Sequence, residues 1–101
     1  MIAKVRTVAV TPDAVDAGVN YLQGTMLPAA REIDGFRGMI GLVDRETGRA
    51  ITVTLWESAE ALEASEAAGA RLRSQGGAPA SRATVERYEV IVNEVVASAK
   101  V

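Results

Sequence analysis

Few side chains in this chain could support chemistry, because it contains neither histidine nor cysteine. Without cysteine there is no disulfide, no thiolate nucleophile and no sulfur ligand for a metal. Without histidine the chain lacks the usual zinc and haem ligand and the most common general base near neutral pH. Ser-His-Asp and Cys-His catalysis are therefore excluded. We expect no metal site and no cofactor, and any catalysis would rest on Asp, Glu, Tyr, Arg, Asn, Trp or the substrate itself.

Two aromatic residues are candidates for lining a ligand pocket. Trp56 is the single tryptophan and stands where an expected strand meets an expected helix. It could form the wall of a pocket for an aromatic ligand, or it could bury a large ring with its N–H near the surface, and the packing interpretation is favoured. Tyr21 stands one helical step from an apolar stripe, so it could flank such a pocket. A boundary position with its hydroxyl in water is the favoured interpretation of Tyr21.

Tyr88 and Asn93 are further pocket candidates, and both fall within a strand expected over residues 84–97. Their separation is odd, and side chains alternate between the faces of a strand, so they should lie on opposite faces. One of them at most can then face a pocket beside the helices. Asn93 would cost free energy to bury without partners, so we expect it to be hydrogen-bonded across a dimer or to face solvent.

Charged residues occur within the expected strands and helices as well. Arg37 and Arg87 could hold an anionic ligand, or they could pair across strands with acidic neighbours, as is usual in sheets. The acidic residues available for such pairs are Glu86, Glu89 and Glu94. The glutamates of the second expected helix, Glu60, Glu63 and Glu66, are interpreted as a solvated face. None of these residues forms a recognisable catalytic constellation, and no catalytic residue is assigned.

Six elements must position these residues. Apolar and β-branched segments predict strands over 2–10, 36–43, 50–56 and 84–97. Apolar residues at helical spacing predict one helix between the first two strands and another that follows Ser58. A polar, glycine-containing segment over 44–49 predicts a hairpin connection, and 74–79 is expected to be a loop.

Local signals define the first helix. Thr11 is suited to the N-cap and Pro12 to the first helical position. Pro28 lacks an amide hydrogen and crowds the carbonyl of Gly24, so a kink or break is expected between them. Asp34-Gly35 is expected to end the helix.

The order strand, helix, strand, strand, helix, strand predicts an α+β domain of the ferredoxin-like βαββαβ type, with a four-stranded antiparallel sheet. Right-handed crossovers place both helices on the same face of that sheet. A chain of 101 residues is near the commonest domain length, so we expect a single domain over residues 1–101. Gly38 and Gly41 interrupt the second strand and mark a bulge or a close approach of another group.

Two helices cover one face of such a sheet and leave the other face bare. The apolar runs Met39-Ile40 and Val90-Ile91-Val92 place apolar side chains on both faces of their strands. A bare apolar face of several hundred Å² would be unusual on a monomer. We therefore expect a homodimer that pairs two sheets face to face, since twofold symmetry is the commonest arrangement.

Composition excludes several other partners. The net charge is −2, and acidic residues are interspersed with the arginines, so no nucleic-acid partner is expected. No apolar run approaches the roughly 20 residues needed to cross a bilayer, so no membrane association is expected. The first six residues do not have the layout of a signal peptide. A cytoplasmic location is the resulting expectation.

Two segments resemble one known family. Residues 27–38, Leu-Pro-Ala-Ala-Arg-Glu-Ile-Asp-Gly-Phe-Arg-Gly, resemble the end of the first helix and the start of the second strand in antibiotic biosynthesis monooxygenase-like proteins. The segment from Asp44 to Gly48 and then from Ala50 to Leu62 resembles their next strand, its terminal tryptophan and the start of their second helix. The resemblance covers about residues 2–97.

This resemblance implies a dimeric α/β barrel with a pocket between helices and sheet in each subunit. Members of the family include cofactor-independent oxygenases that make quinones from polycyclic phenols, haem-degrading enzymes and many proteins of unassigned role. The haem branch depends on a histidine ligand, which is missing here. The quinone-forming branch is similar at Trp56, but it tends to carry asparagine at the position of Thr52. It also tends to carry a tyrosine after the tryptophan, and residues 57–70 contain none.

The resemblance makes Thr52 the fifth pocket candidate and leads to two hypotheses. The first is a cofactor-independent oxygenase acting on a small planar hydrophobic or phenolic compound. The second is a non-catalytic dimeric protein that binds a small molecule or is associated with stress.

Overall fold

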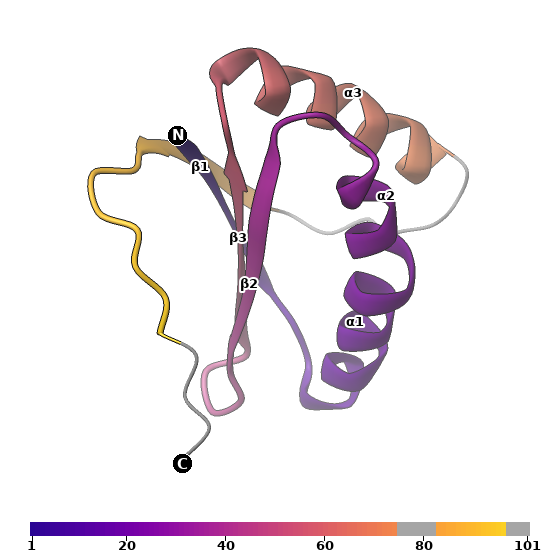
Figure 1. Cartoon of the computed structure of the whole chain (residues 1–101). Coiled ribbons are helices and arrows are strands. Elements are labelled where there is room, and N and C mark those ends of the chain that lie inside the picture. The colour runs from indigo at the N-terminus through magenta and orange to yellow at the C-terminus, as the bar shows by residue number, and fades with distance from the viewer. Residues whose placement is uncertain (75–82, 97–101) are drawn as a thin grey trace.

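The computed structural model describes residues 1–74 and 83–96, and in the last turn of the second long helix, residues 71–74, it describes the backbone alone. The fold is a two-layer α+β arrangement of one sheet and one layer of helices (Figure 1). The strands are β1 (Ile2–Ala9), β2 (Phe36–Asp44), β3 (Arg49–Trp56) and β4 (Ala83–Glu89), and the helices are α1 (Val15–Tyr21), α2 (Leu27–Arg31) and α3 (Ala59–Ser74).

The four strands form one antiparallel sheet in the order β2-β3-β1-β4. This is the ferredoxin-like topology, so the predicted fold is confirmed. Both helical segments lie on one face of the sheet. Leu22, which follows α1, approaches Gly41 of β2, and Glu66 of α3 reaches Lys4 of β1 on the same face. The opposite face carries no helix among the described residues (Figure 1).

The first helical segment is interrupted where the sequence predicts. A 3₁₀ turn over Pro12–Ala14 leads into α1, and a π-helical turn over Leu22–Met26 separates α1 from α2. In that turn the Leu27 amide donates to the Leu22 carbonyl, five residues back. Pro28 has no amide hydrogen to offer Gly24, so the wider turn relieves a conflict that a regular α-helix would contain.

Gly35 allows the turn between α2 and β2 to pack directly against α3. Its φ is +90°, a conformation that L side chains rarely adopt, and a Cβ at this position would lie 2.6 Å from the Ala61 Cβ. The Gly35 carbonyl accepts a hydrogen bond from the Glu57 amide at 2.7 Å. The helix α2 ends at Arg31, earlier than the predicted end at Asp34-Gly35, and Gly35 instead fixes how closely the two helical segments approach.

The hairpin between β2 and β3 has the predicted connection. The Asp44 carboxylate accepts hydrogen bonds from the amides of Glu46, at 2.9 Å, and Thr47, at 3.2 Å. Gly48 has a φ of +72°, and its carbonyl accepts from the Val10 amide at 2.7 Å. The hairpin is thus joined to the end of β1 as well as to its own strands. The expected bulge is found at the start of β2, where the register with β3 shifts between Phe36 and Gly38.

Ser58 caps α3 as predicted. Its hydroxyl accepts a hydrogen bond from the Ala61 amide at 3.2 Å, and its carbonyl accepts from the Leu62 amide at 3.1 Å. Leu62 is fully buried and anchors the helix on the sheet. Thr11, in contrast, occupies the N-cap position without a side-chain hydrogen bond to the turn that follows.

The best-packed part of the core lies at one end of the sheet. Trp56, Leu62 and Ala30 form a buried cluster, and their partly buried neighbours are Ile2, Ile33, Phe36 and Ala61. Strands, the helix α2 and the helix α3 all contribute to it, so it connects the two layers.

The last strand is shorter than predicted. We expected a strand over 84–97, but β4 ends at Glu89, and residue 97 lies outside the described residues. The Val90 amide still donates to the Met1 carbonyl at 3.0 Å. The extended segment that follows lies on the side of the sheet away from the helices (Figure 1). Its apolar side chains are exposed: Ile91, Val92, Val95 and Val96. Most of the loop expected over 74–79 also lies outside the described residues.

Candidate functional site

The strand register divides the sheet into a helix-facing side and an open face. Ile2 lies opposite Trp56, and Lys4, two residues on, reaches α3. Side chains alternate along each strand, so the helix-facing side of the two central strands is defined by every second residue. These residues are Ile2, Lys4, Arg6 and Val8 of β1, and Ala50, Thr52, Thr54 and Trp56 of β3. The intervening residues point to the open face.

Trp56 belongs to the core cluster at the closed end of the helix-facing side. Its side chain is 2% exposed, and its ring meets that of Phe36 edge-to-face, with centroids 5.2 Å apart. The position of the ring therefore agrees with the favoured interpretation, in which Trp56 is buried by packing. The indole Nε1 is buried as well, and no acceptor among the described residues hydrogen-bonds to it. A buried donor without a partner costs about 1–3 kcal/mol, which makes Nε1 the most notable polar atom of this region.

Thr52 lies on the same side of β3 as Trp56, four residues before it, and Thr54 lies between them. Both threonines are half-buried although they lie in a central strand, so solvent still reaches this part of the helix-facing side. Thr52 lies directly between Arg6 of β1 and Gly41 of β2. The structure thus places Trp56 and Thr52 on one surface, two pleats apart.

A charged cluster lies beside these residues. The Glu66 carboxylate of α3 pairs with Lys4 of β1, at 3.8 Å, and with the guanidinium of Arg87 of β4. Arg87 therefore pairs with neither Glu86, Glu89 nor Glu94, and the interpretation of Glu66 as part of a solvated face is wrong. Glu66 lies one helical turn after Leu62, which is buried against the sheet, and this position brings its carboxylate over the strands. Arg37 pairs instead with Glu57, at 3.1 Å, in an exposed position.

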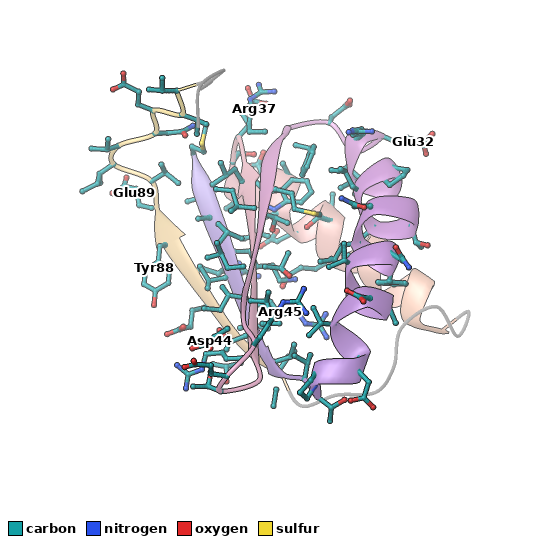
Figure 2. The ribbon with its side chains drawn as sticks, turned by 90° about the horizontal axis from the view of Figure 1, so that it is seen from below. Glu32, Arg37, Asp44, Arg45, Tyr88 and Glu89 are labelled. Atoms are coloured by element: carbon teal, nitrogen blue, oxygen red, sulfur yellow. The ribbon has the colours of Figure 1, made fainter. Side chains whose placement is uncertain are left out.

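Three other candidates lie elsewhere. Tyr88 is on the open face and points away from the helices (Figure 2). Its hydroxyl donates to Glu86 Oε2 at 2.9 Å, and this hydrogen bond, together with the negative charge of Glu86, raises the Tyr88 pKa. Tyr21 is half-buried at the last position of α1. Asn93 lies beyond β4 and is exposed, with its Nδ2 3.5 Å from Met1 Sδ. The prediction that Tyr88 and Asn93 occupy opposite faces of one strand is therefore wrong, because the strand ends between them.

The hairpin end of the sheet carries two open depressions. One, of about 170 Å³, is lined by Leu42, Val43, Asp44, Arg49 and Ile51, and the other, of about 290 Å³, is lined by Thr7, Val8, Ala9, Thr47, Gly48, Arg49 and Thr84. Neither reaches Trp56 or Thr52. Arg45, in the hairpin, points toward α1 (Figure 2), where it lies 3.9 Å from Asp16. This ion pair is exposed, and we assign no binding role to these depressions.

Two further properties concern the described residues alone. They contain no group of three or more aspartates and glutamates placed to hold a metal ion. None of their helices is long and apolar enough to cross a membrane.

No model of a known protein family matches the sequence. The chain is 36% identical over 89 residues to the uncharacterised protein Rv2558 of Mycobacterium tuberculosis, an alignment that covers 87% of this chain and 38% of the relative. The chain thus spans about two fifths of the length of this curated relative.

Solved structures share the whole fold. The heme-degrader MhuD of Mycobacterium tuberculosis, with two hemes bound in its active site, superposes with a TM-score of 0.71 at 24% identity, over 94% of this chain and 100% of that one. The monooxygenase ActVA-Orf6 of Streptomyces coelicolor, in complex with nanaomycin D, gives a TM-score of 0.68 at 19% identity, over 93% and 92%. This chain therefore has the antibiotic biosynthesis monooxygenase-like fold, and the resemblance found in its sequence is confirmed at that level.

Proposed function

We propose that this chain binds a small planar hydrophobic or phenolic compound on the helix-facing side of its sheet and oxidises it with molecular oxygen, without a cofactor. The unpaired indole N–H of Trp56 carries this proposal, since a buried donor gains most from an acceptor that a ligand supplies. The neighbours support it, because one of them is a monooxygenase in complex with the ligand nanaomycin D.

The proposed reaction makes few demands on the protein. An electron-rich phenol can itself reduce O₂: one oxygen atom enters the ring to give a quinone, and the other leaves as water. The protein would bind the ring, exclude water and orient the phenolic oxygen. Trp56 would donate a hydrogen bond to that oxygen, and Thr52 could contact the ring system from the same side of β3.

Oxygen uptake tests the oxygenase proposal. Purified protein would be incubated with a panel of hydroxylated anthracenes and naphthalenes while dissolved oxygen and quinone absorbance are followed. We expect Trp56→Phe, which keeps a ring and removes the N–H, to lower turnover by about tenfold, the effect of one hydrogen bond. Tyr88→Phe, on the open face, is the matched control and should leave turnover unchanged. No acceleration by the wild-type protein across the panel would refute the proposal.

Binding without catalysis is the second candidate function. It is supported by Thr52, which stands where quinone-forming members tend to carry asparagine, and by the absence of tyrosine from residues 57–70. Native mass spectrometry of freshly purified protein separates the two functions. A co-purified small molecule that persists unchanged after long incubation in air supports binding, and its reproducible conversion supports catalysis.

We also propose that the protein forms a homodimer through the open face. This face carries apolar side chains that remain substantially exposed, with Ile40 at 44% and Leu42 at 52%. Their exposure on adjacent parts of one edge strand leaves an apolar patch that a second copy could cover. The exposed apolar segment beyond β4 lies on the same side and supports the proposal. The single domain over 1–101 and the cytoplasmic location remain predictions.

Light scattering at micromolar concentration tests the dimer. We expect wild-type protein to have the mass of a dimer and Leu42→Glu to have the mass of a monomer, because a buried, unpaired carboxylate would oppose the interface. Val19→Glu is the control, since Val19 is similarly exposed, at 41%, but lies on α1. A wild-type monomer would contradict the proposal.

A further inference from the structure

The helix-facing side of the sheet gathers three cationic side chains on two neighbouring strands. Lys4 lies opposite Arg87 in the pairing of β1 with β4, and Arg6 is the next residue of β1 on the same side. Residues at this spacing have Cα atoms about 7 Å apart, within reach of one another's long side chains. The three cations therefore form one patch, close to the middle of the sheet.

Two of the three cations share a carboxylate partner. Glu66 serves both Lys4 and Arg87. Arg6 has neither an ion pair nor a side-chain hydrogen bond with any described residue. Its neighbours across the strands are uncharged: Thr52 on β3 and Val85 on β4. Arg6 is thus a cation of this patch that pairs with no carboxylate among the described residues.

Arg6 is half-buried, in a central strand beneath the helical layer. A guanidinium that has lost part of its water gains strongly from a counter-ion, and its planar donors match a carboxylate in two parallel hydrogen bonds. The hydroxyl of Thr52, directly opposite, can donate a further bond to the same anion. The side chains of Val85 and Val8 flank this position with apolar surface suited to the body of a hydrophobic ligand.

We propose that the ligand of this site is a planar hydrophobic acid, whose carboxylate or phenolate group is bound by Arg6 with help from Thr52. This inference rests on the proposed function, because it concerns the same side of the sheet. It adds to the proposed function the negative charge of the ligand and the residue, Arg6, that selects a ligand with this charge. Arg6 lies about two pleats along the sheet from the Ile2–Trp56 pair, so a ligand with its anion at Arg6 can extend its rings toward the aromatic end.

A matched pair of fluorescent probes tests the inference. Anthracenecarboxylate and anthracenemethanol, each substituted on the central ring, have nearly the same shape and differ in charge at neutral pH. Each would be titrated into wild-type protein and into Arg6→Gln, Arg6→Lys and Arg37→Gln. Arg37 is the control because it is an exposed strand arginine that pairs with Glu57 away from the patch. Circular dichroism melting curves would establish that each variant is folded.

We expect wild-type protein to bind the acid about tenfold or more tightly than the alcohol, the usual effect of a hydrogen bond to a charged group. Arg6→Gln should abolish this preference by weakening binding of the acid about tenfold, whereas Arg6→Lys should retain part of it. Arg37→Gln should behave like wild type.

Other outcomes overturn the inference in distinguishable ways. Equal affinity of wild-type protein for both probes, or a preference retained in Arg6→Gln, would refute the role of Arg6 while the proposed aromatic ligand stands. Binding of neither probe would remove the proposed function and the inference with it. If Arg6→Gln does not fold, the acid–alcohol comparison in wild type and in Arg6→Lys decides.

Discussion

The two faces of the sheet differ in the kinds of side chain that they carry. On the helix-facing side an apolar cluster around Trp56 gives way, along the strands, to threonines and cations. The open face is lined instead by aliphatic residues such as Val5, Val53 and Ile40, although no described helix covers it. A monomer would be expected to place its polar groups on the uncovered face. The proposed homodimer would cover the apolar open face, and the anionic group of the proposed hydrophobic acid would pair with the cations of the covered side.

Among substitutions that compare the two faces, Trp56→Ala is expected to have the largest effect on the free energy of unfolding. Removing the ring that packs on Phe36 and Leu62 should lower the free energy of unfolding by about 3–5 kcal/mol, because it leaves a cavity where the helices meet the sheet. Chemical denaturation measures this loss. Tyr88→Ala, an aromatic truncation on the open face at 52% exposure, should cost less than about 1 kcal/mol at protein concentrations below those that support a dimer. Equal losses would show that the two faces do not differ as described.

Gly35→Ala tests how tightly the covered side is closed. A methyl group there would lie 2.6 Å from the Ala61 Cβ and would require a backbone with φ of +90°, so we expect a loss of about 2–3 kcal/mol. Gly24→Ala is the matched control, because nothing lies within 4 Å of its added Cβ and its backbone is helical. Alanine is the better helix former, so this variant should be neutral or slightly more stable. Thermal unfolding of both variants measures the difference.

Glu66→Gln should have a smaller effect, of about 1 kcal/mol. The substitution removes the shared counter-ion of Lys4 and Arg87, which are partly screened by solvent, with side chains 21% and 46% exposed. Glu57→Gln, which breaks the more exposed pair with Arg37, should change stability by less than about 0.5 kcal/mol. Urea denaturation at low and high salt checks both values. A salt-independent loss at Glu66 would argue against an electrostatic origin.

The smallest effect is expected from Asp44, at the hairpin end of the open face. Hydrogen bonds from the backbone amides of Thr47 and Glu46 hold its pKa below the usual value of 3.8. A lowered pKa in the folded state stabilises the protein above the unfolded-state value, and this contribution is lost as pH falls through the folded-state pKa. Asp44→Asn should therefore be slightly less stable than wild type at pH 7, and the difference should disappear at acidic pH. Melting temperatures of both proteins at pH 7 and at a series of acidic pH values below 3.8 test this.

Much of the fold could be predicted because its signals are local. The β-branched segments, the Ser58 cap and the conflict between Pro28 and Gly24 each involve residues close in sequence. The length of the last strand could not be predicted in this way. The run from Val90 to Val96 has strand-forming composition, but a strand also needs a neighbour to pair with. Among the described residues, no backbone hydrogen bond joins this run to the neighbouring strand beyond the one from the Val90 amide.

The candidate site could be predicted less well, because it depends on contacts between distant elements. Trp56 was identified from its position at the end of a strand, and the resemblance pointed to Thr52. The charged patch was missed because the helical spacing of Glu60, Glu63 and Glu66 suggests one uniform exposed face. Arg6 was also missed. A stricter use of strand alternation, with Ile2 and Trp56 on the inner side, would have placed Lys4 and Arg6 beneath the helices.

The position of β1 in the middle of the sheet has a consequence for synthesis. This first strand pairs with β3 and β4, so Val8 must meet Ala83, a residue made some 75 positions later. At translation rates of about 5–20 residues per second, roughly 4–15 s separate the two. The β2–β3 hairpin is the one pair of strands adjacent in sequence, and it can form during that interval. Until β4 is made, one hydrogen-bonding edge of β1 therefore stays open even after β3 has paired with its other edge, and an open strand edge is where another chain can pair.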